Sequence, residues 1–174
     1  YTYYDIADNT FKDFKSIRFT DKMRTATGER SKKRAFNEFQ VRQLIVRNDG
    51  GFVMLTEDFY VSTRNSYNQG FGYYSWYYPS MSASVREYNY GDILAMSFNG
   101  NGEPEWAKFI RKEQYSQEDG GLFSSYALIN TGGSLGFLFN DFNMNTSKVQ
   151  LATLDANGNV TMDLLTTFKR EDPD

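Results

Sequence analysis

Two Asn-Gly dipeptides, each flanked by short apolar segments, constrain this fold more than any other feature of the sequence. Asn101-Gly102 separates residues 93–98 from residues 106–110, and Asn157-Gly158 separates residues 149–154 from residues 162–165. A two-residue type I′ turn needs positive φ at both central residues, which Asn followed by Gly tolerates best. Each dipeptide therefore predicts a two-residue β-hairpin.

A second pair of turn signals lies upstream of the first. Gly50-Gly51 and Gly132-Gly133 are each flanked by short apolar runs, and aligning residues 44–55 with residues 126–137 matches the two dipeptides. Such runs around a glycine pair indicate further hairpins. The repeating unit is therefore four consecutive antiparallel strands. The sequence predicts an all-β fold of four-stranded antiparallel blades that form part of a β-propeller.

We expect residues 1–174 to form one β-propeller fragment. Its segments are residues 1–19, the end of a preceding blade; 20–40, a basic connector; 41–112, a blade with a long aromatic loop at 62–90; and 113–174, a second blade. The chain opens as though in mid-strand, which favours a piece of a longer polypeptide. Trp106 is expected to be buried between neighbouring blades, because a large ring at a repeated position seals such an interface.

The basic connector could be a patch for phosphate, lipid A or an acidic partner, or a solvated crossing between blades. No interleaved aromatic residues or phosphate-cradling glycines accompany its charges, which favours the solvated crossing. The whole chain has a formal net charge of −3 and a pI near 5.1. This charge argues against a nucleic-acid partner.

The loop at residues 62–90 holds the candidate binding residues because it is unusually dense in aromatic side chains. The candidates are Tyr73, Tyr74, Trp76, Tyr77 and Tyr78. Aromatic faces offer large contact areas with a polar edge, so these residues could contact a protein partner or stack on the sugar rings of a glycan. They could also pack on one another across the strands of a long hairpin.

Motifs for catalysis or cofactor binding are absent from the sequence. The chain has no histidine and no cysteine, which removes the commonest general base, the commonest metal ligand and any thiolate chemistry. No phosphate-binding loop, nucleophile elbow or dinucleotide fingerprint occurs. Carboxylate pairs such as Glu57 and Asp58 are interpreted as solubilising surface residues. We therefore predict no catalytic residue, no cofactor and no enzyme activity.

Two segments resemble the start of a calcium-binding EF-hand loop. They are Asp141-x-Asn143-x-Asn145 and Asp155-x-Asn157-x-Asn159. Both lack the glycine at the sixth position and the bidentate Glu at the twelfth. Because Asp and Asn are common turn residues, we predict turns and no metal site.

Several segments carry a family resemblance. Residues 98–106 are similar to the turn-plus-tryptophan repeat of quinoprotein-like propellers. The runs 42–57, 90–93, 102–112, 118–126 and 139–141 together resemble a family of uncharacterised propeller-like proteins of Bacteroidota-type bacteria. This resemblance implies export to the periplasm or cell surface and carries no assigned activity.

The expected function is a non-enzymatic scaffold or protein-interaction module of a bacterial envelope or cell-surface assembly. Its partner would be another protein or the remainder of the same polypeptide. The alternative is a glycan-binding module that uses the aromatic loop. No run of about 18 apolar residues occurs, so we expect no membrane span.

Overall fold

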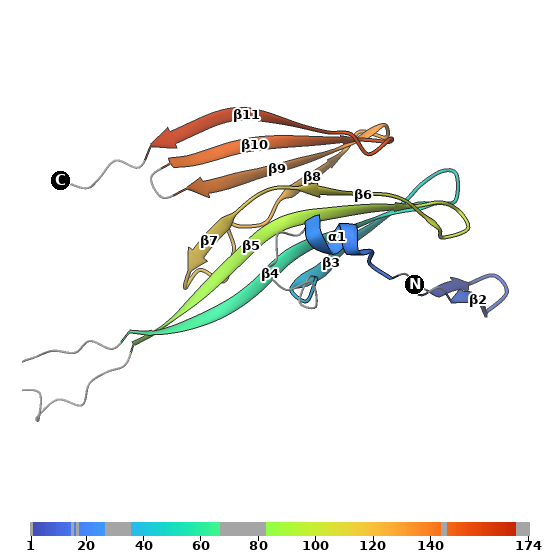
Figure 1. Ribbon diagram of the computed structural model, residues 1–174, viewed down its shortest axis with the longest axis horizontal. Helices are drawn as coiled ribbons and strands as arrows, with labels where there is room; N and C mark the ends of the chain where they lie inside the picture. The colour runs from blue at the N-terminus through green and yellow to red at the C-terminus, as the bar shows by residue number, and fades with distance from the viewer. Residues whose placement is uncertain are drawn as a thin grey trace, which may run out of the picture.

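The computed structural model describes residues 2–14, 16, 18–26, 36–66, 83–143 and 146–169. This part of the chain consists of antiparallel strands and one short helix (Figure 1). The elements are β1 (Thr2–Asp5), β2 (Thr10–Phe14), α1 (Asp21–Ala26), β3 (Phe39–Val46), β4 (Phe52–Ser66), β5 (Ala83–Phe98), β6 (Pro104–Ile110), β7 (Gln114–Gln117), β8 (Ala127–Asn130), β9 (Ser134–Asn143), β10 (Thr146–Asp155) and β11 (Val160–Lys169). The expected all-β fold is confirmed.

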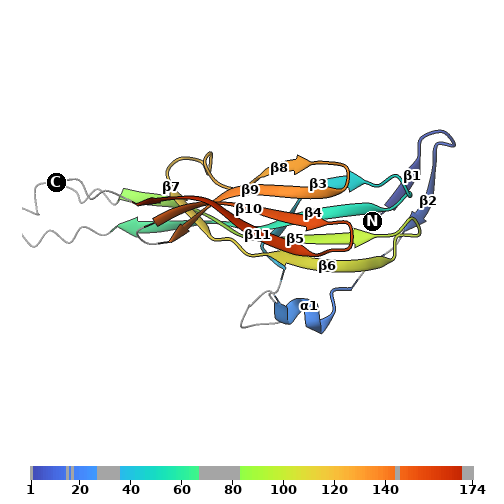
Figure 2. The same cartoon turned by 90° about the horizontal axis from the view of Figure 1, so that it is seen from above.

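The strands form two larger sheets that face each other, and β1 and β2 form a separate hairpin. The first sheet has the order β3-β4-β5-β6, with β7 also paired to β5, and the second has the order β8-β9-β10-β11. Seen from above, the two sheets run in the same sense, from β3 and β8 at one edge to β6 and β11 at the other (Figure 2). The described residues thus form two stacked, open meanders and no closed barrel.

Strand β7 extends the first sheet beyond the expected boundary at residue 112. It pairs with the half of β5 that β6 leaves free, from Tyr90 opposite Gln114 to Glu87 opposite Gln117. Strand β6 ends opposite Ile93, whereas β4 and β5 continue together to Ser66 and Ala83. The long hairpin therefore leaves an open edge, and the segment after β6 covers part of it.

The two Asn-Gly hairpins have three-residue loops, so the expected two-residue type I′ turns are wrong. Only the glycines take positive φ, 71° at Gly102 and 82° at Gly158. In the first loop the amide of Gly102 donates to the carbonyl of Asn99 at 2.8 Å, and the amide of Asn99 donates to the carbonyl of Glu103 at 3.0 Å. A turn followed by one left-handed glycine is the usual three-residue hairpin loop.

The side chain of the residue just before each loop explains this loop length. Asn99 Oδ1 accepts hydrogen bonds from the amides of Asn101 and Glu103, at 3.0 and 2.9 Å. Asp155 Oδ1 makes the same two bonds in the second hairpin, to the amides of Asn157 and Asn159. This side-chain bridging fixes the three residues between its partners. The two hairpin loops are therefore equivalent residue by residue, with residues 99–103 matching residues 155–159.

The two Gly-Gly turns differ in length, which corrects the alignment of the repeats. The first is closed by the amide of Arg47 donating to the carbonyl of Gly51, and the second by Thr131 donating to Ser134. The second turn is therefore one residue shorter. Because neighbouring strand residues point to opposite faces, this shift matches Leu55 with Leu138 and not with Phe137.

The main core lies between the two sheets. The first sheet contributes Val53, Leu55, Ile93, Ala95 and Ile110, and the second contributes Leu135, Phe137, Phe139, Ala152 and Leu154. These residues alternate along their strands with residues on the opposite face, as in two-layer β structures. Burial of both apolar faces against each other makes the two meanders one packed unit.

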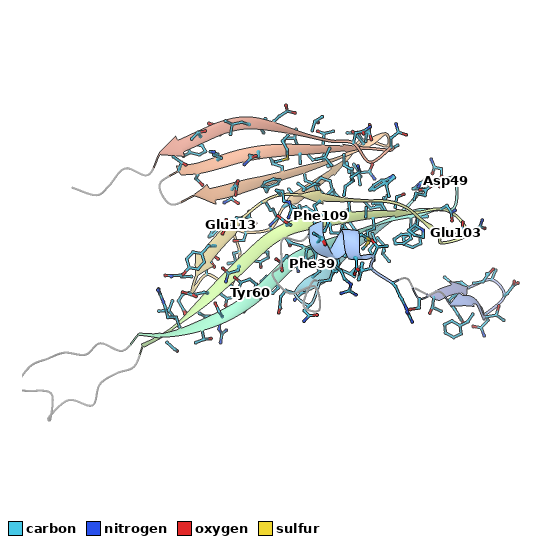
Figure 3. All side chains as sticks on the ribbon, viewed as in Figure 1. Phe39, Asp49, Tyr60, Glu103, Phe109 and Glu113 are labelled. Atoms are coloured by element: carbon cyan, nitrogen blue, oxygen red, sulfur yellow. The ribbon has the colours of Figure 1, made fainter. Side chains whose placement is uncertain are left out.

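A second cluster covers the other face of the first sheet. Leu94, Met96 and Phe98 of β5 are buried there. Phe19 and Met23, from before and within α1, pack against them together with Phe36, Phe39 and Phe109. Phe39 and Phe109 lie beside α1 in the side-chain view (Figure 3). The described ends of the basic connector therefore contribute apolar packing and are more than a solvated crossing.

Candidate functional site

All five predicted binding residues lie outside the described part of the chain. Tyr73, Tyr74, Trp76, Tyr77 and Tyr78 belong to residues 67–82, so their role stays a prediction. The strands that lead to this segment are described, and they pair as far as Ser66 opposite Ala83. Figure 1 shows the ends of β4 and β5 projecting beyond the second sheet.

A cleft of about 420 Å³ opens between the two sheets at the end where the hairpin turns lie. Apolar side chains of both sheets line it, including Ile45, Val53, Leu135 and Leu154. Polar groups from the turns also line it, among them Arg47, Asp49, Asn130 and Asp155, together with Trp106. An apolar concave surface with a few polar groups is the usual form of a small-ligand site.

The charged side chains beside this cleft form one network. The guanidinium of Arg47 pairs with the carboxylates of Asp49 and Glu105, and it donates a hydrogen bond to Ser97 Oγ at 2.7 Å. The Ser97 hydroxyl in turn donates to Glu105 at 2.7 Å. These hydrogen bonds, from Ser97 first and then from Arg47, hold the pKa of Glu105 below its ordinary value. With one cation and two carboxylates, the network carries one net negative charge.

Trp106 lies between the two sheets, as expected, but it is half-buried and not enclosed. Its Nε1 donates to the carbonyl of Ala156 in the β10–β11 turn, at 3.3 Å. Its ring lies against Gly158 of the same turn, where a Cβ would approach Trp106 Cδ2 to 2.8 Å. The ring therefore joins β6 to the second sheet and forms part of the cleft wall.

A buried ionic cluster lies farther along the same interface. The side chains of Glu57 on β4 and Lys112 after β6 have no exposed surface, and Lys112 Nζ lies 2.7 Å from Glu57 Oε1. Arg42 on β3 donates from Nε to Glu57 Oε2 at 2.9 Å. Burial lowers the pKa of Lys112, and the nearby Glu57 carboxylate partly offsets this effect. One buried carboxylate thus contacts two cations, the buried Lys112 and the partly exposed Arg42.

Hydrogen bonds from this cluster connect the two sheets. Ser125, just before β8, donates from Oγ to Glu57 Oε2 at 2.7 Å. Gln114 on β7 receives the Lys112 ammonium at Oε1, at 2.8 Å, and its Nε2 donates to the carbonyl of Asn140 on β9 at 2.7 Å. Buried polar groups need such partners because they have lost water. The cluster therefore fixes how the sheets sit on each other at this end.

Tyr126 places an unsatisfied hydroxyl near the cluster. Its ring packs on Phe137, with centroids 5.4 Å apart, and its buried hydroxyl has no hydrogen-bond partner among the described residues. Burial, followed by the nearby Glu57 carboxylate, raises the pKa of Tyr126 to about 12. The hydroxyl therefore stays protonated at any physiological pH.

The interpretation of Glu57 as a solubilising surface residue is wrong, because its side chain is fully buried. Strand alternation could have indicated this. Val53, Leu55 and Glu57 occupy every second position of β4, and the first two belong to the main core. Residues two apart share one face of a strand, which places Glu57 on the inner face. No comparable signal predicts Lys112, because it follows the end of β6.

Carboxylates of the two EF-hand-like segments take part in structural hydrogen bonds. Asp141 accepts from the amide of Glu113 at 3.1 Å and from Gln150 Nε2 at 2.9 Å. Asp155 bridges its own turn. Within the described ranges, no group of three or more Asp or Glu residues has the geometry of a metal site.

Comparisons with protein-family models, curated proteins and solved structures give no match to this chain. Among the residues that the structure describes, no helix has the length and apolar character needed to cross a membrane.

Proposed function

We propose that this protein is a non-enzymatic scaffold or protein-interaction module, built from propeller-type blades, in a bacterial envelope or cell-surface assembly. Two four-stranded meanders stacked in the same sense support the blade assignment. The resemblance to propeller-like Bacteroidota-type proteins supports the location. A partner is either another protein or a further part of the same polypeptide.

One observation carries the proposed interaction role: the second sheet leaves apolar side chains exposed. On its edge strand β11, Leu164, Leu165 and Phe168 are each more than half exposed. Ile129 of β8 is 48% exposed, whereas Ile45, at the matching position of the first meander, packs against the core. Apolar side chains left exposed on both edge strands of one sheet favour contact with another protein.

This function can be tested by asking whether one substitution on this surface removes the binding of a partner. The full-length protein, tagged and purified from its native cells, would be compared with Leu151→Lys on the outer face of the second sheet. Leu44→Lys is the matched control, since Leu44 is an exposed leucine on β3 of the first sheet. Both the proteins that co-purify and the protease resistance of the full-length polypeptide would be measured.

We expect Leu151→Lys to lose a partner that the wild type and Leu44→Lys retain, or to become more protease-sensitive than Leu44→Lys. The second result applies where the contact is made within one polypeptide. Equal partner sets together with equal protease resistance in all three proteins would refute the proposed interaction role. Circular dichroism spectra of both variants would confirm that they are folded.

The cleft beside Trp106 favours a second candidate function, the binding of a glycan. It combines an aromatic ring, apolar side chains and turn residues, which suits the apolar faces and the hydroxyl groups of a sugar. The candidate that uses the aromatic loop at 62–90 stays a separate prediction. Glycan-array binding that Trp106→Ala removes would support the cleft, and binding that persists in this variant would exclude it.

A further inference from the structure

The outer face of the second sheet repeats a face that the first sheet buries. The equivalent hairpins match Ile93 with Val149 and Ala95 with Leu151. The closing pairs of the Gly-Gly turns match Ile45 with Ile129 and Leu55 with Leu138. Thus each of these core-facing residues of the first sheet has an apolar counterpart in the second.

These counterparts share one surface on the second sheet. Leu138 and Leu151 are cross-strand partners. Gly136 lies between them and β8, where a Cβ would be 3.4 Å from Leu151 Cδ1 and 3.5 Å from Ile129 Cβ. We call Ile129, Leu138, Val149 and Leu151 the open face. No described element lies over it (Figure 1).

Burial differs sharply between the two matching faces. Leu55, Ile93 and Ala95 have no exposed surface because the second meander covers them. Leu138, Val149 and Leu151 are partly exposed, and Ile129 is 48% exposed. Apart from Gly136 and Thr166, which match Val53 and Ile110, the surface that receives one meander in the first sheet is therefore present again on the second, unoccupied by described residues.

The opposite end of the stack is closed. The first sheet also has an outer face, which corresponds to the buried face of the second sheet. It holds Leu94, Met96 and Phe98, and all three are nearly inaccessible to solvent. Phe19, Met23 and Phe36 cover it. A second copy of this chain could not dock its open face there without displacing that packing. Head-to-tail association of identical chains is thus blocked.

We infer that the open face docks one further four-stranded antiparallel meander, packed in the same sense as the second meander packs on the first. This inference names the partner of the proposed interaction module and so rests on that function. The partner presents an apolar face with large and small residues in the places that Phe137, Ala152 and Leu154 take in the existing interface. Stacking proceeds in one direction only, because α1 and its flanking residues close the other end.

An extended chain provides the direct test. Residues 111–174 are repeated immediately after Thr166, the position that matches Ile110 in the equivalent hairpins. The added copy then follows Thr166 of β11 in the same way that the natural residues 111–174 follow Ile110 of β6. Because the chain contains no cysteine, one introduced thiol reports the exposure of one position without interference.

Three single-cysteine variants would be labelled with a maleimide in the parent and in the extended chain. Leu151→Cys, in the first copy, reports the open face. Leu44→Cys is an exposed control on β3, and Ala95→Cys changes the buried residue that matches Leu151. We expect the extension to slow labelling of Leu151→Cys about tenfold or more, toward the rate of Ala95→Cys, because labelling then requires local opening. The labelling rate of Leu44→Cys should not change.

Two results would overturn the inference. The first is an unchanged labelling rate of Leu151→Cys in the extended chain. This result counts whether or not circular dichroism shows that the added copy is folded, because an open face that docks a meander should also promote its folding. The second is a parent dimer, measured by light scattering, that Leu151→Lys dissociates, because a second copy would then occupy the open face.

The outcomes separate this inference from the proposed function. If Leu151→Lys loses a partner but the extension does not protect the thiol of Leu151→Cys, the interaction role is kept and a meander is rejected as the partner. Protection of that thiol without any effect of Leu151→Lys in native cells would keep the docking geometry and reject the interaction role.

Discussion

The indole ring of Trp106 lies on the backbone of Gly158, joining β6 of the first sheet to the β10–β11 turn of the second. A Cβ added at Gly158 would come within 2.8 Å of Trp106 Cδ2. Gly158 also has φ of 82°, which favours glycine. Gly158 is therefore under two constraints: its backbone conformation and its contact with the other sheet.

A matched pair of glycine substitutions separates these constraints. Gly132 has the same φ of 82°, but nothing lies within 4 Å of a Cβ there. We expect Gly132→Ala to lower the free energy of unfolding by about 1–2 kcal/mol, the cost of a left-handed non-glycine residue. Gly158→Ala should lower it by a further ~1–3 kcal/mol from overpacking against the ring. Urea unfolding measures both, and equal losses would show that the ring moves aside freely.

The buried pair of Glu57 and Lys112 predicts strong coupling. Glu57→Leu leaves Lys112 charged and without its counter-ion, so we expect a loss of about 3–5 kcal/mol in the free energy of unfolding. The double variant Glu57→Leu, Lys112→Leu should be more stable than Glu57→Leu alone, because Lys112 is then no longer an unpaired buried charge. Additive losses in a double-mutant cycle would show that the two side chains do not interact.

Tyr126→Phe should stabilise the protein, because it removes a buried hydroxyl that has no partner among the described residues. A gain of about 1 kcal/mol in the free energy of unfolding is expected, the lower end of the penalty for an unsatisfied buried group. A loss of more than about 1 kcal/mol would mean that the hydroxyl makes an important hydrogen bond.

The raised pKa of Tyr126 also predicts a dependence on alkaline pH. Its folded pKa of about 12 exceeds the ordinary value of 10.0, so the unfolded chain loses this proton first. The resulting stability is complete below pH 10 and is lost as the pH rises toward 12. Tyr126→Phe should therefore lose less stability than the wild type over this interval, in urea titrations at fixed pH. Parallel curves for the two proteins would contradict the assignment.

Asp155 predicts an effect at acid pH. Hydrogen bonds from Asn159 and Asn157 hold its pKa below the ordinary 3.8. The stability that this carboxylate provides is therefore present above pH 3.8 and is lost as the pH falls through the lowered folded value. Asp155→Asn should keep the turn, because Asn99 makes the same backbone bonds with an amide. Its unfolding curve should depend less on pH in this range than that of the wild type.

Asp155→Ala is the control for the turn itself. It removes the acceptor that Asp155→Asn keeps, so it should destabilise the hairpin at neutral pH as well as at acid pH. If Asp155→Asn and Asp155→Ala behaved alike at neutral pH, the side-chain bridge would not be what holds the loop.

The strand order could be predicted from the sequence because turns depend on local residues. Glycine is the residue that takes positive φ at least cost, so Gly50, Gly102, Gly132 and Gly158 all identify turns correctly. Loop length was harder to predict. Asn101 and Asn157 do not take positive φ, because Asn99 and Asp155 bridge the loops through their side chains. One residue of loop length then decides which face each later side chain occupies.

The tertiary features lacked a local signal. Phe19 and Met23 pack on β5 of the first sheet, which is far from them in the sequence. Nothing in the charged connector indicated this apolar contact. Pairing of Glu57 with Lys112 depends likewise on the path of the chain after β6. The predicted binding residues at 73–78 stay untested.

Strand β7 has a consequence for how the molecule opens. It ends at Gln117, opposite Glu87, so among the described residues β4 and β5 continue past it as a two-stranded ribbon, to Ser66 and Ala83. A two-stranded ribbon is marginally stable in water on its own. Amide hydrogen exchange along β5 should therefore run in a gradient, slowest at Ile93 and fastest toward Ala83. The ribbon can fray and re-form many times during one lifetime of the folded core.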